Sequence, residues 1–221
     1  MERILRSGSD IVLHDPRRLP SPSPAWLHAE AWLHAEAWER AGGIVARFGG
    51  RGEALAVDGP FGSAVLKTYR RGGLVRHLVR QRYAWTGFDR ARSVREWRVL
   101  RALFDAGLPV PEPLAARVSR RGLGYQAALL TRYIDGARPL DRVADELDPG
   151  DWQDIDALID RFAAAGLHHP DLNATNLLVS PDGRLWLVDF DRARLRNRPA
   201  NPGPMHARLT RSLTKLGIRR R

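Results

Sequence analysis

The sequence predicts an α+β protein in which an antiparallel sheet with one main helix precedes a reduced helical lobe. Short apolar stretches at 44–48, 53–57 and 63–69 are separated by glycine-rich turn sequences, which is typical of an antiparallel meander. Residues 74–106 then carry a helical pattern of apolar positions. A second apolar stripe at 151–165 predicts a helix in the later lobe.

The remaining elements of the first half follow from turn residues and local periodicity. We expect residues 1–24, which are rich in proline, to form a loosely ordered extension. The hexapeptide AWLHAE occurs twice over 25–36, and we interpret it as a short duplication within a helix. Strands are predicted at 114–119 and 125–132, and the segment 133–140 is expected to cross between lobes.

The second half begins with the helix at 151–165, for which Asp151 is a plausible cap. Residues 176–190 place two apolar runs on either side of Pro-Asp-Gly, which predicts a hairpin. The tail from 205 to 221 is a candidate basic amphipathic helix, with Leu209, Leu213 and Leu216 on one side. These elements suggest an N-terminal extension and helix at 1–43, an N-lobe at 44–135 and a reduced C-lobe with a basic tail at 136–221.

Composition restricts the kind of protein. The chain of 221 residues has no cysteine, so disulfides and thiolate metal sites are excluded. It lacks an apolar run long enough for a membrane span, and its start does not resemble a secretory signal, so we expect a cytoplasmic protein, soluble or peripheral. The formal net charge is +11, and only Lys67 and Lys215 are lysines. Such an excess of arginine favours an anionic partner.

Two acidic motifs in the second half carry the clearest chemical signal. HHPDLNATN (168–176) contains Asp171 and Asn176, and VDFD (188–191) contains Asp189. Asp171 could accept a proton from a hydroxyl group, while Asn176 and Asp189 offer oxygen ligands of the kind that Mg²⁺ prefers. A hairpin between the motifs would return the chain, so that both metal ligands face the same way.

Each motif has a simpler interpretation when taken alone. Asp171 could form an Asx turn or cap a helix, which is the commoner role of an aspartate in a loop. His169 is expected to support the loop through hydrogen bonds and not to perform chemistry. Asp191 could bind metal or pair with Arg192 or Arg194, and the sequence does not decide between these roles.

Together these motifs resemble the catalytic loop and metal-binding aspartate of the protein-kinase-like superfamily. The resemblance implies a two-lobed kinase fold, ATP and Mg²⁺. It also implies a lysine on the third strand of the N-lobe sheet, which is Lys67 in AVLK, and a helix glutamate, for which Glu96 is the candidate. The turn GGRG lies where a phosphate-covering loop belongs, although an ordinary hairpin turn is the alternative. The resemblance therefore implies that Asp171, Lys67 and Glu96 are catalytic, that Gly49, Gly50, Gly52 and Lys67 bind the nucleotide, and that Asn176 and Asp189 bind the metal.

Departures from the regulated protein kinases narrow the resemblance. Pro170 replaces the arginine of their catalytic loop, Asp191 replaces the glycine of their DFG motif, and no APE motif follows. We therefore expect a small-molecule or glycolipid hydroxyl as the acceptor. The segments LKTYRRGGL (66–74) and LTRYIDG (130–136), with the two acidic motifs, are similar to lipopolysaccharide-core sugar kinases, in particular the 3-deoxy-D-manno-octulosonic acid (Kdo) kinase family. That family implies phosphorylation of the 4-hydroxyl of Kdo on a lipid A precursor, at the cytoplasmic face of the inner membrane.

The segment from 70 to 101 contains ten arginines against Asp89 and Glu96. These arginines could hold a carboxylated, phosphorylated glycolipid and contact the anionic inner-membrane surface, or they could form a solvated helix face in an arginine-rich protein. Two other functions stay open. One is a different small-molecule or heptose kinase, and the other is a catalytically inactive, arginine-rich module that binds nucleic acid, although we expect no nucleic-acid partner.

Overall fold

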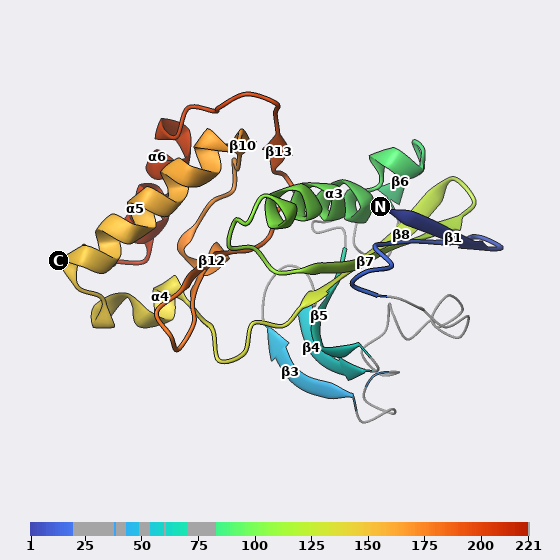
Figure 1. Cartoon of the computed structure of the whole chain (residues 1–221), viewed down its shortest axis with the longest axis horizontal. Helices are drawn as coiled ribbons and strands as arrows, with labels where there is room; N and C mark the ends of the chain where they lie inside the picture. Colours follow the sequence, from blue (N-terminus) through green and yellow to red (C-terminus); the bar gives the residue numbers. More distant parts are fainter. Residues whose placement is uncertain (20–37, 39–42, 49–53, 60, 70–82, 221) are drawn as a thin grey trace. The chain divides into compact units, whose positions relative to one another are not determined.

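The computed structural model describes the chain except for residues 20–37, 39–42, 49–53, 60, 70–82 and 221 (Figure 1). It divides into two compact units, which are described one at a time. Unit 1 contains residues 1–98 and 112–133, and unit 2 contains residues 99–111 and 134–221. The boundary at residue 133 falls at the start of the segment that the sequence predicts as a crossover.

Unit 1 is built on an eight-stranded sheet in the order β1-β2-β7-β8-β5-β4-β3, with the short β6 also paired to β8 (Figure 1). Every pairing in it is antiparallel. Its strands are β1 (Arg3–Ser7), β2 (Asp10–His14), β3 (Ile44–Phe48), β4 (Ala54–Gly59), β5 (Gly62–Thr68), β6 (Tyr83–Ala84), β7 (Pro113–Arg121) and β8 (Gly124–Arg132). The meander predicted at 44–69 and the later strand pair are both confirmed.

The inner strands of the sheet are apolar because one face packs into a core. Alternate residues of β5 are buried, as expected for a strand with one covered face. The core cluster is made of residues from five strands and one loop, namely Val12, Leu19, Leu55, Val57, Ala64, Leu66, Leu114, Ala115, Ala128 and Leu130. This packing holds β5, and with it Lys67, in a defined register opposite β8.

The N-terminal segment departs from the expectation of a loosely ordered extension. Residues 3–7 and 10–14 form a hairpin, and β2 pairs with β7 with all five of its residues buried. From the neighbouring strand β7, Arg117 donates to Asp10 of this hairpin at 2.8 Å, and both side chains are almost fully buried. The prediction was wrong here because the strand is short and β7 supplies both the pairing edge and the covering side chains.

The long helix predicted at 74–106 is shorter in the structure. Residues 83–84 form β6, a 3₁₀ turn covers Phe88–Arg90, and α3 spans Arg92–Asp105. Gly87, at φ 114°, precedes the 3₁₀ turn with a backbone conformation that breaks a helix. Residues 74–82 lie outside the described part of the chain. The clearest part of the pattern is confirmed, since α3 buries Val94, Trp97, Leu100 and Leu103.

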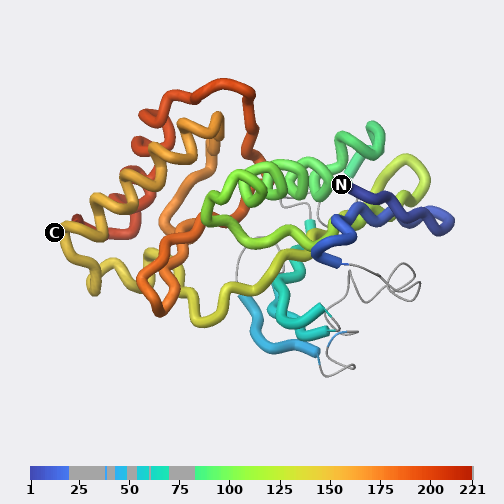
Figure 2. Tube along the Cα trace, viewed as in Figure 1, coloured from blue at the N-terminus to red at the C-terminus, as the bar shows by residue number. Residues whose placement is uncertain are grey.

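Unit 2 contains helices and two small sheets, which can be followed along the trace in Figure 2. Strand β11 lies between β12 and β9, and β10 pairs with β13. The elements are β9 (Arg138–Pro139), α4 (Leu140–Val143), a 3₁₀ turn at Ala144–Glu146, α5 (Pro149–Ala164), β10 (Leu167–His168), a 3₁₀ turn at Ala174–Asn176, β11 (Leu177–Val179), β12 (Leu185–Leu187), β13 (Arg194–Leu195) and α6 (Gly203–Lys215). The predicted hairpin at 176–190 is confirmed as β11 and β12.

Details at the helix ends differ from the sequence prediction. The N-cap of α5 is Asp148, whose side chain accepts from the Asp151 backbone N–H at 2.9 Å. The Asp151 carboxylate in turn accepts from the Asp148 backbone N–H at 2.8 Å, so it closes a capping box and does not cap the helix itself. In α6, Leu209 and Leu213 are buried as expected, but Leu216 lies after the helix and is 49% exposed.

The helices in the described part of the chain are all too short or too polar to cross a bilayer.

Candidate active site

One group of candidate site residues is an ion pair within unit 1. Lys67 Nζ, on β5, lies 2.9 Å from both Oε1 and Oε2 of Glu96 on α3. Glu96 is 2% exposed, and the Lys67 side chain is 24% exposed. A lysine held this way by a buried carboxylate presents its ammonium group at a fixed place, which is what the binding of phosphate oxygens requires.

Aromatic side chains complete this ion pair. The Tyr69 hydroxyl donates to Glu96 Oε2, and the Tyr69 ring lies 5.1 Å from Lys67 Nζ. Arg92 packs over the rings of Tyr69 and Tyr83 and donates to the Tyr83 hydroxyl at 2.7 Å. The Tyr69 hydroxyl therefore helps to fix Glu96, and Arg92 packs against the Tyr69 ring.

A separate group of candidate site residues lies in unit 2, in the loop from His169 to Asn176. Asn173 and Asn176 each donate a side-chain N–H to the Asp171 backbone oxygen, at 3.0 and 3.2 Å. Asn173 also accepts from the Thr175 backbone N–H and so caps the 3₁₀ turn. The loop is held by its own hydrogen bonds, while the Asp171 carboxylate remains 39% exposed and reachable by a substrate.

Asp189 reaches the same region through the hairpin. Leu177 pairs with Leu187, and the Val188 N–H donates to the Asn176 backbone oxygen at 2.9 Å. Among the residues that the structure describes, Asp189 is the one non-glycine residue with a positive φ, 64°. That conformation costs an aspartate about 1 to 2 kcal/mol, and strain of this kind is concentrated at functional sites.

His169 is a buried residue at the start of this loop. It is 1% exposed and packs against Phe190, with ring centroids 5.5 Å apart. Burial lowers the pKa of His169 below its ordinary value, and the negative charge of Asp189 opposes that shift. Packing on Phe190 is consistent with a supporting role, but the expected hydrogen bonds are not present, because both ring nitrogens are buried without a hydrogen-bond partner among the described residues.

Two arginines lie beside the Asp171 carboxylate. Arg192 Nη1, in the loop after β12, is 3.3 Å from Asp171 Oδ2. Arg208 Nη2, on α6, is 3.7 Å from Asp171 Oδ1. The expected candidates for an Arg192 contact included Asp191, but the ion pair that the structure resolves for Arg192 is with Asp171.

The donor set fits a magnesium ion shared with phosphates. The Asn176 amide nitrogen donates to the Asp171 backbone oxygen, so the amide oxygen, which accepts only a long hydrogen bond from Thr175 Oγ1 at 3.5 Å, is the end that could bind a metal. With the Asp189 carboxylate, it forms a pair of hard oxygen ligands. In the described part of the chain, no three His, Asp or Glu side chains form a metal cage of their own. A site completed by substrate phosphates is the common form for Mg²⁺.

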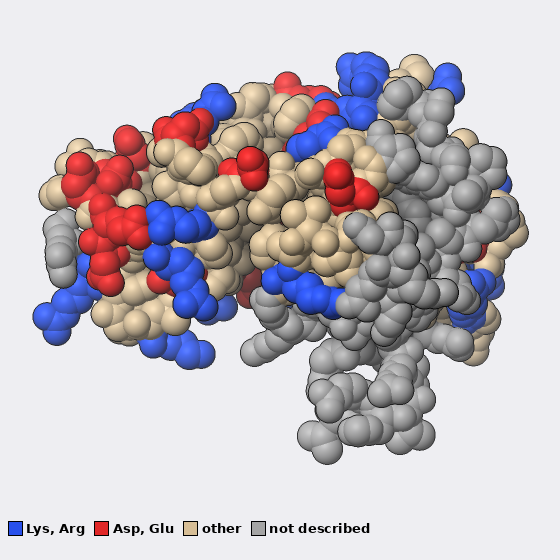
Figure 3. Space-filling view, turned by 90° about the horizontal axis from the view of Figure 1, so that it is seen from below, with Lys and Arg blue, Asp and Glu red and all other residues tan. Residues whose placement is uncertain are grey.

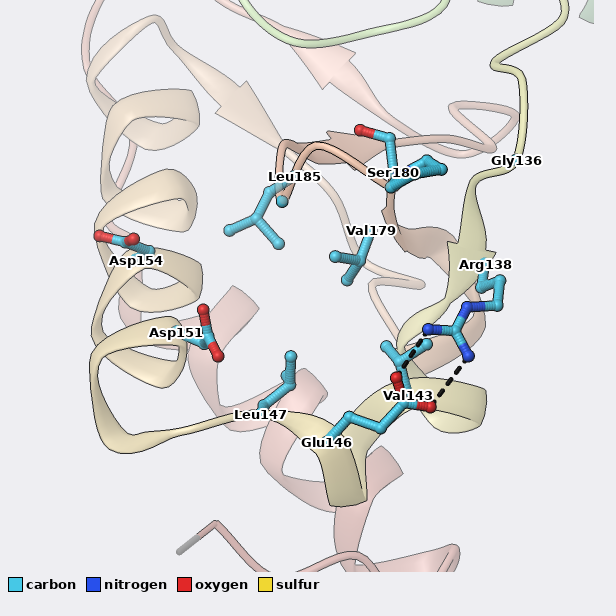
Figure 4. Close-up of a pocket in the computed structure, with 12 residues that line it drawn as sticks. Gly136, Arg138, Val143, Glu146, Leu147, Asp151, Asp154, Val179, Ser180 and Leu185 are labelled. Atoms are coloured by element: carbon cyan, nitrogen blue, oxygen red, sulfur yellow. Dashed lines mark hydrogen bonds and ion pairs between the residues drawn. The ribbon is translucent and has the colours of Figure 1, made fainter.

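A cavity of about 310 Å³ in unit 2 contains none of these residues. Figure 4 shows Leu147, Val179 and Leu185 lying toward one another across it, with Arg138 paired to Glu146 at its edge. It is lined by residues of the β11–β12 turn, β9 and the start of α5. The cavity is lined by neither the candidate base nor the candidate metal ligands. We therefore expect the chemistry at the loop from His169 to Asn176 and not in this cavity.

The predicted site residues fall into three groups. Lys67 and Glu96 are brought together in unit 1, and Asp171, Asn176 and Asp189 are gathered by one loop and one hairpin in unit 2. Gly49, Gly50 and Gly52 lie outside the described residues, in the connection between β3 and β4. The roles assigned to all of these residues stay predictions.

Sequence reasoning missed three contributors. Tyr69 is two positions after Lys67 and directly follows the end of β5, so the alternation of a strand could have placed it on the same face. Arg192 was considered only as a partner for Asp191. Arg208 had no local signal, because it lies on a helix far along the chain from Asp171.

An antiparallel sheet carrying a lysine paired to a helix glutamate, together with this catalytic loop and a following aspartate, defines a protein-kinase-like phosphotransferase. Comparison with known proteins agrees and is more specific. The model of the Lipopolysaccharide kinase (Kdo/WaaP) family matches residues 35–220, and the chain belongs to that family. It is an ATP-dependent kinase.

Several curated relatives carry the name 3-deoxy-D-manno-octulosonic acid kinase. The protein of Xylella fastidiosa (strain M23) is 47% identical over 171 residues, which cover 76% of this chain and 68% of the relative. The protein of Xanthomonas campestris pv. campestris (strain B100) is 48% identical over 170 residues, with the same coverage of each chain. The protein of Stenotrophomonas maltophilia (strain R551-3) is 47% identical over 171 residues, again with that coverage.

Proposed function

We propose that this kinase transfers the γ-phosphoryl group of ATP to the 4-hydroxyl of a Kdo residue on a lipid A precursor. The names of its relatives support the acceptor, because all three are Kdo kinases and share almost half of their aligned residues with this chain. The observation that carries the catalytic part is the Lys67–Glu96 ion pair, in which both carboxylate oxygens lie 2.9 Å from the ammonium group.

In this proposal Asp171 orients the acceptor hydroxyl and takes its proton as the new O–P bond forms. Its carboxylate is partly exposed, and its backbone is held by Asn173 and Asn176, so the side chain can meet a substrate without first ordering the loop. Pre-organisation of this kind lowers the entropic part of the barrier.

Lys67 would neutralise the phosphate charge of ATP, with Glu96 and Tyr69 fixing its direction. Asn176 and Asp189 would hold Mg²⁺, which when bound neutralises charge on the transferred phosphoryl group. Gly49, Gly50 and Gly52 are proposed to cover the phosphates.

We further propose that the protein acts as a peripheral protein on the cytoplasmic face of the inner membrane. The net charge of +11 supports attraction to an anionic leaflet. Figure 3 shows carboxylates at one end of the visible surface, with Lys or Arg side chains beside them. In the segment 145–154, Asp145, Glu146, Asp148 and Asp154 are exposed, and Glu146 pairs with Arg138. The remaining carboxylates would turn this part of unit 2 away from such a leaflet.

The test combines purified protein, ATP, Mg²⁺ and a Kdo-bearing lipid A precursor, with phosphate incorporation followed by mass spectrometry and the position assigned by NMR. The proposal expects one phosphate at the 4-hydroxyl. A panel of heptose-bearing cores and aminoglycosides is run in parallel. Turnover of one of those acceptors, with none of the Kdo lipid, would replace the proposed acceptor while leaving the kinase assignment intact.

A further inference from the structure

Two arginines lie beside the Asp171 carboxylate, although the loop is already held by its own hydrogen bonds. Arg192 and Arg208 approach opposite oxygens of one carboxylate from two different elements, at 3.3 and 3.7 Å. Their side chains are 69% and 41% exposed, so part of each is open to solvent and to a ligand.

These contacts are loose compared with other ion pairs in unit 2. Arg138 places two nitrogens at 2.9 and 2.7 Å from Glu146, and Arg220 contacts both oxygens of Asp156 at 2.9 and 2.7 Å. Arg208 instead reaches Asp171 only beyond hydrogen-bond distance. Its Nε is buried and has no hydrogen-bond partner among the described residues. A guanidinium group has five N–H donors, so most of the donors of this residue remain unused.

The position of Arg208 is nevertheless well defined. Helix α6 buries Leu209 next to it, together with Met205 and Leu213. One turn further on, Ser212 Oγ accepts from the Ala174 backbone N–H at 3.1 Å, which joins α6 to the catalytic loop. An arginine on a helix anchored at this loop presents its donors at a fixed distance from the proposed base.

We propose that Arg192 and Arg208 form a binding subsite for the carboxylate of an acidic sugar acceptor. This inference rests on the proposed function, because a sugar acid carries a carboxylate close to the hydroxyl groups of its ring. Arginine binds carboxylate through two parallel N–H···O bonds, and these are stronger than neutral hydrogen bonds. The acceptor carboxylate then takes donors that the Asp171 carboxylate uses weakly, which places a sugar hydroxyl beside Asp171 Oδ.

The arginines at 70–101 are less suited to this role where the structure describes them. Arg98 lies 3.1 Å from Glu2 and 2.8 Å from Asp89, and Arg101 is 3.5 Å from Asp105. Their charges are already paired with carboxylates of unit 1 or of their own helix. Arg90 and Arg95 are exposed and remain available for a diffuse interaction with an anionic surface.

The experiment compares two acceptors that differ only in this group: the Kdo lipid and its carboxamide. Arg192→Gln and Arg208→Gln are measured alongside the wild type, with Arg211→Gln on the exposed side of α6 as the matched control. We expect the wild-type KM to be about tenfold or more higher for the carboxamide, since a charged hydrogen-bonded pair is lost. Each of the two variants should raise KM for the acid by a similar factor, leave KM for ATP unchanged, and raise KM for the carboxamide little further.

The outcomes separate the inference from the proposed function. Suppose that the wild type phosphorylates the Kdo lipid, but that the variants raise KM equally for the acid and the carboxamide, or lower only kcat. The arginines then position Asp171, and the subsite is refuted. If the wild type phosphorylates neither acceptor, the proposed function fails and the inference fails with it. Thermal unfolding of each variant identifies any loss that comes from misfolding, and Arg192, in an exposed loop, provides the test if Arg208→Gln is unstable.

Discussion

The candidate site residues of unit 1 hold their charged groups more firmly than those of unit 2. In unit 1, Glu96 is buried and contacts both Lys67 and Tyr69 at hydrogen-bond distance. In unit 2, Asp171 is partly exposed, and its arginine contacts lie at 3.3 and 3.7 Å. The Lys67–Glu96 pair, which would hold the nucleotide, is joined at hydrogen-bond distance, whereas the arginines beside Asp171 contact it loosely and keep N–H donors for an acceptor.

The difference corresponds to what each group of residues is proposed to bind, the nucleotide in unit 1 and the acceptor in unit 2. Every kinase reaction of this class uses the same triphosphate, so a lysine fixed by a buried carboxylate is sufficient in unit 1. An acceptor contributes its own charge, and a loosely paired base with spare arginine donors can exchange partners when it binds. Three substitutions examine this contrast, beginning with the largest expected effect, and a fourth tests how the stability of unit 1 depends on pH.

Asp171→Asn removes the proposed base while preserving its size. We expect kcat to fall about 10³-fold, because general-base catalysis contributes on this scale. ATP affinity, measured by titration calorimetry, should change little. Asp154→Asn, on the exposed face of α5, is the control and should retain full activity. A turnover number within about threefold of wild type for Asp171→Asn would exclude Asp171 as the base.

Glu96→Gln removes the negative charge that holds Lys67. We expect kcat/KM for ATP to fall about 10 to 100-fold, because one charge-assisted contact to a buried group is lost and the ammonium group is no longer fixed. Steady-state kinetics with varied ATP measures the effect. The control is Asp89→Asn, which removes a 75% exposed carboxylate that pairs with Arg98 on the same helix. Equal kinetics for the two variants would show that the ion pair is structural only.

Tyr69→Phe removes one hydroxyl from the ion pair and keeps the ring. The free energy of unfolding should fall by about 1 kcal/mol, and kcat/KM for ATP by a few-fold at most, since Lys67 still contacts both oxygens of Glu96. Urea unfolding and steady-state kinetics provide the two values. Tyr83→Phe, which loses the hydroxyl that accepts from Arg92, should affect stability without affecting kinetics. A larger kinetic loss for Tyr69→Phe than for Glu96→Gln would contradict this ranking.

A substitution at His14 tests whether the stability of unit 1 depends on pH through a residue outside the candidate active site. It is 2% exposed, its Nδ1 lies 2.9 Å from the Leu19 carbonyl oxygen, and burial lowers its pKa below the ordinary 6.5. In the window below pH 6.5 the unfolded chain therefore binds the proton more readily, so stability falls as the pH is lowered. Urea unfolding between pH 7.5 and 5.5 should show this loss.

The same series on His14→Gln should give a shallower pH dependence. It should not become flat, because the pKa of buried His169 is lowered in the same direction. An unchanged slope in the variant would show that His14 does not contribute to acid sensitivity.

Local patterns were sufficient for much of the fold. The strands around Lys67 and the hairpin before Asp189 combine apolar alternation with glycine turns, so their ends were predicted within a few residues. The helix at 92–105 was predicted from its apolar stripe, but its start was not, because residues 83–91 share the same composition and the break depends on the pairing of β6 with β8. The N-terminal hairpin was missed for a similar reason, since its stability comes from β7.

By itself, the order of residues determined the catalytic loop, the lysine strand, the candidate glutamate and the class of chemistry, because each of these is written as a short pattern with fixed neighbours. Only the tertiary structure decided which groups surround them. Tyr69 turns its hydroxyl to Glu96, Asp148 and not Asp151 caps α5, and Arg208 reaches Asp171 from a helix with no pattern that points to it. Such contacts depend on how separate elements pack, and packing joins residues whose distance along the chain carries no information about their distance in space.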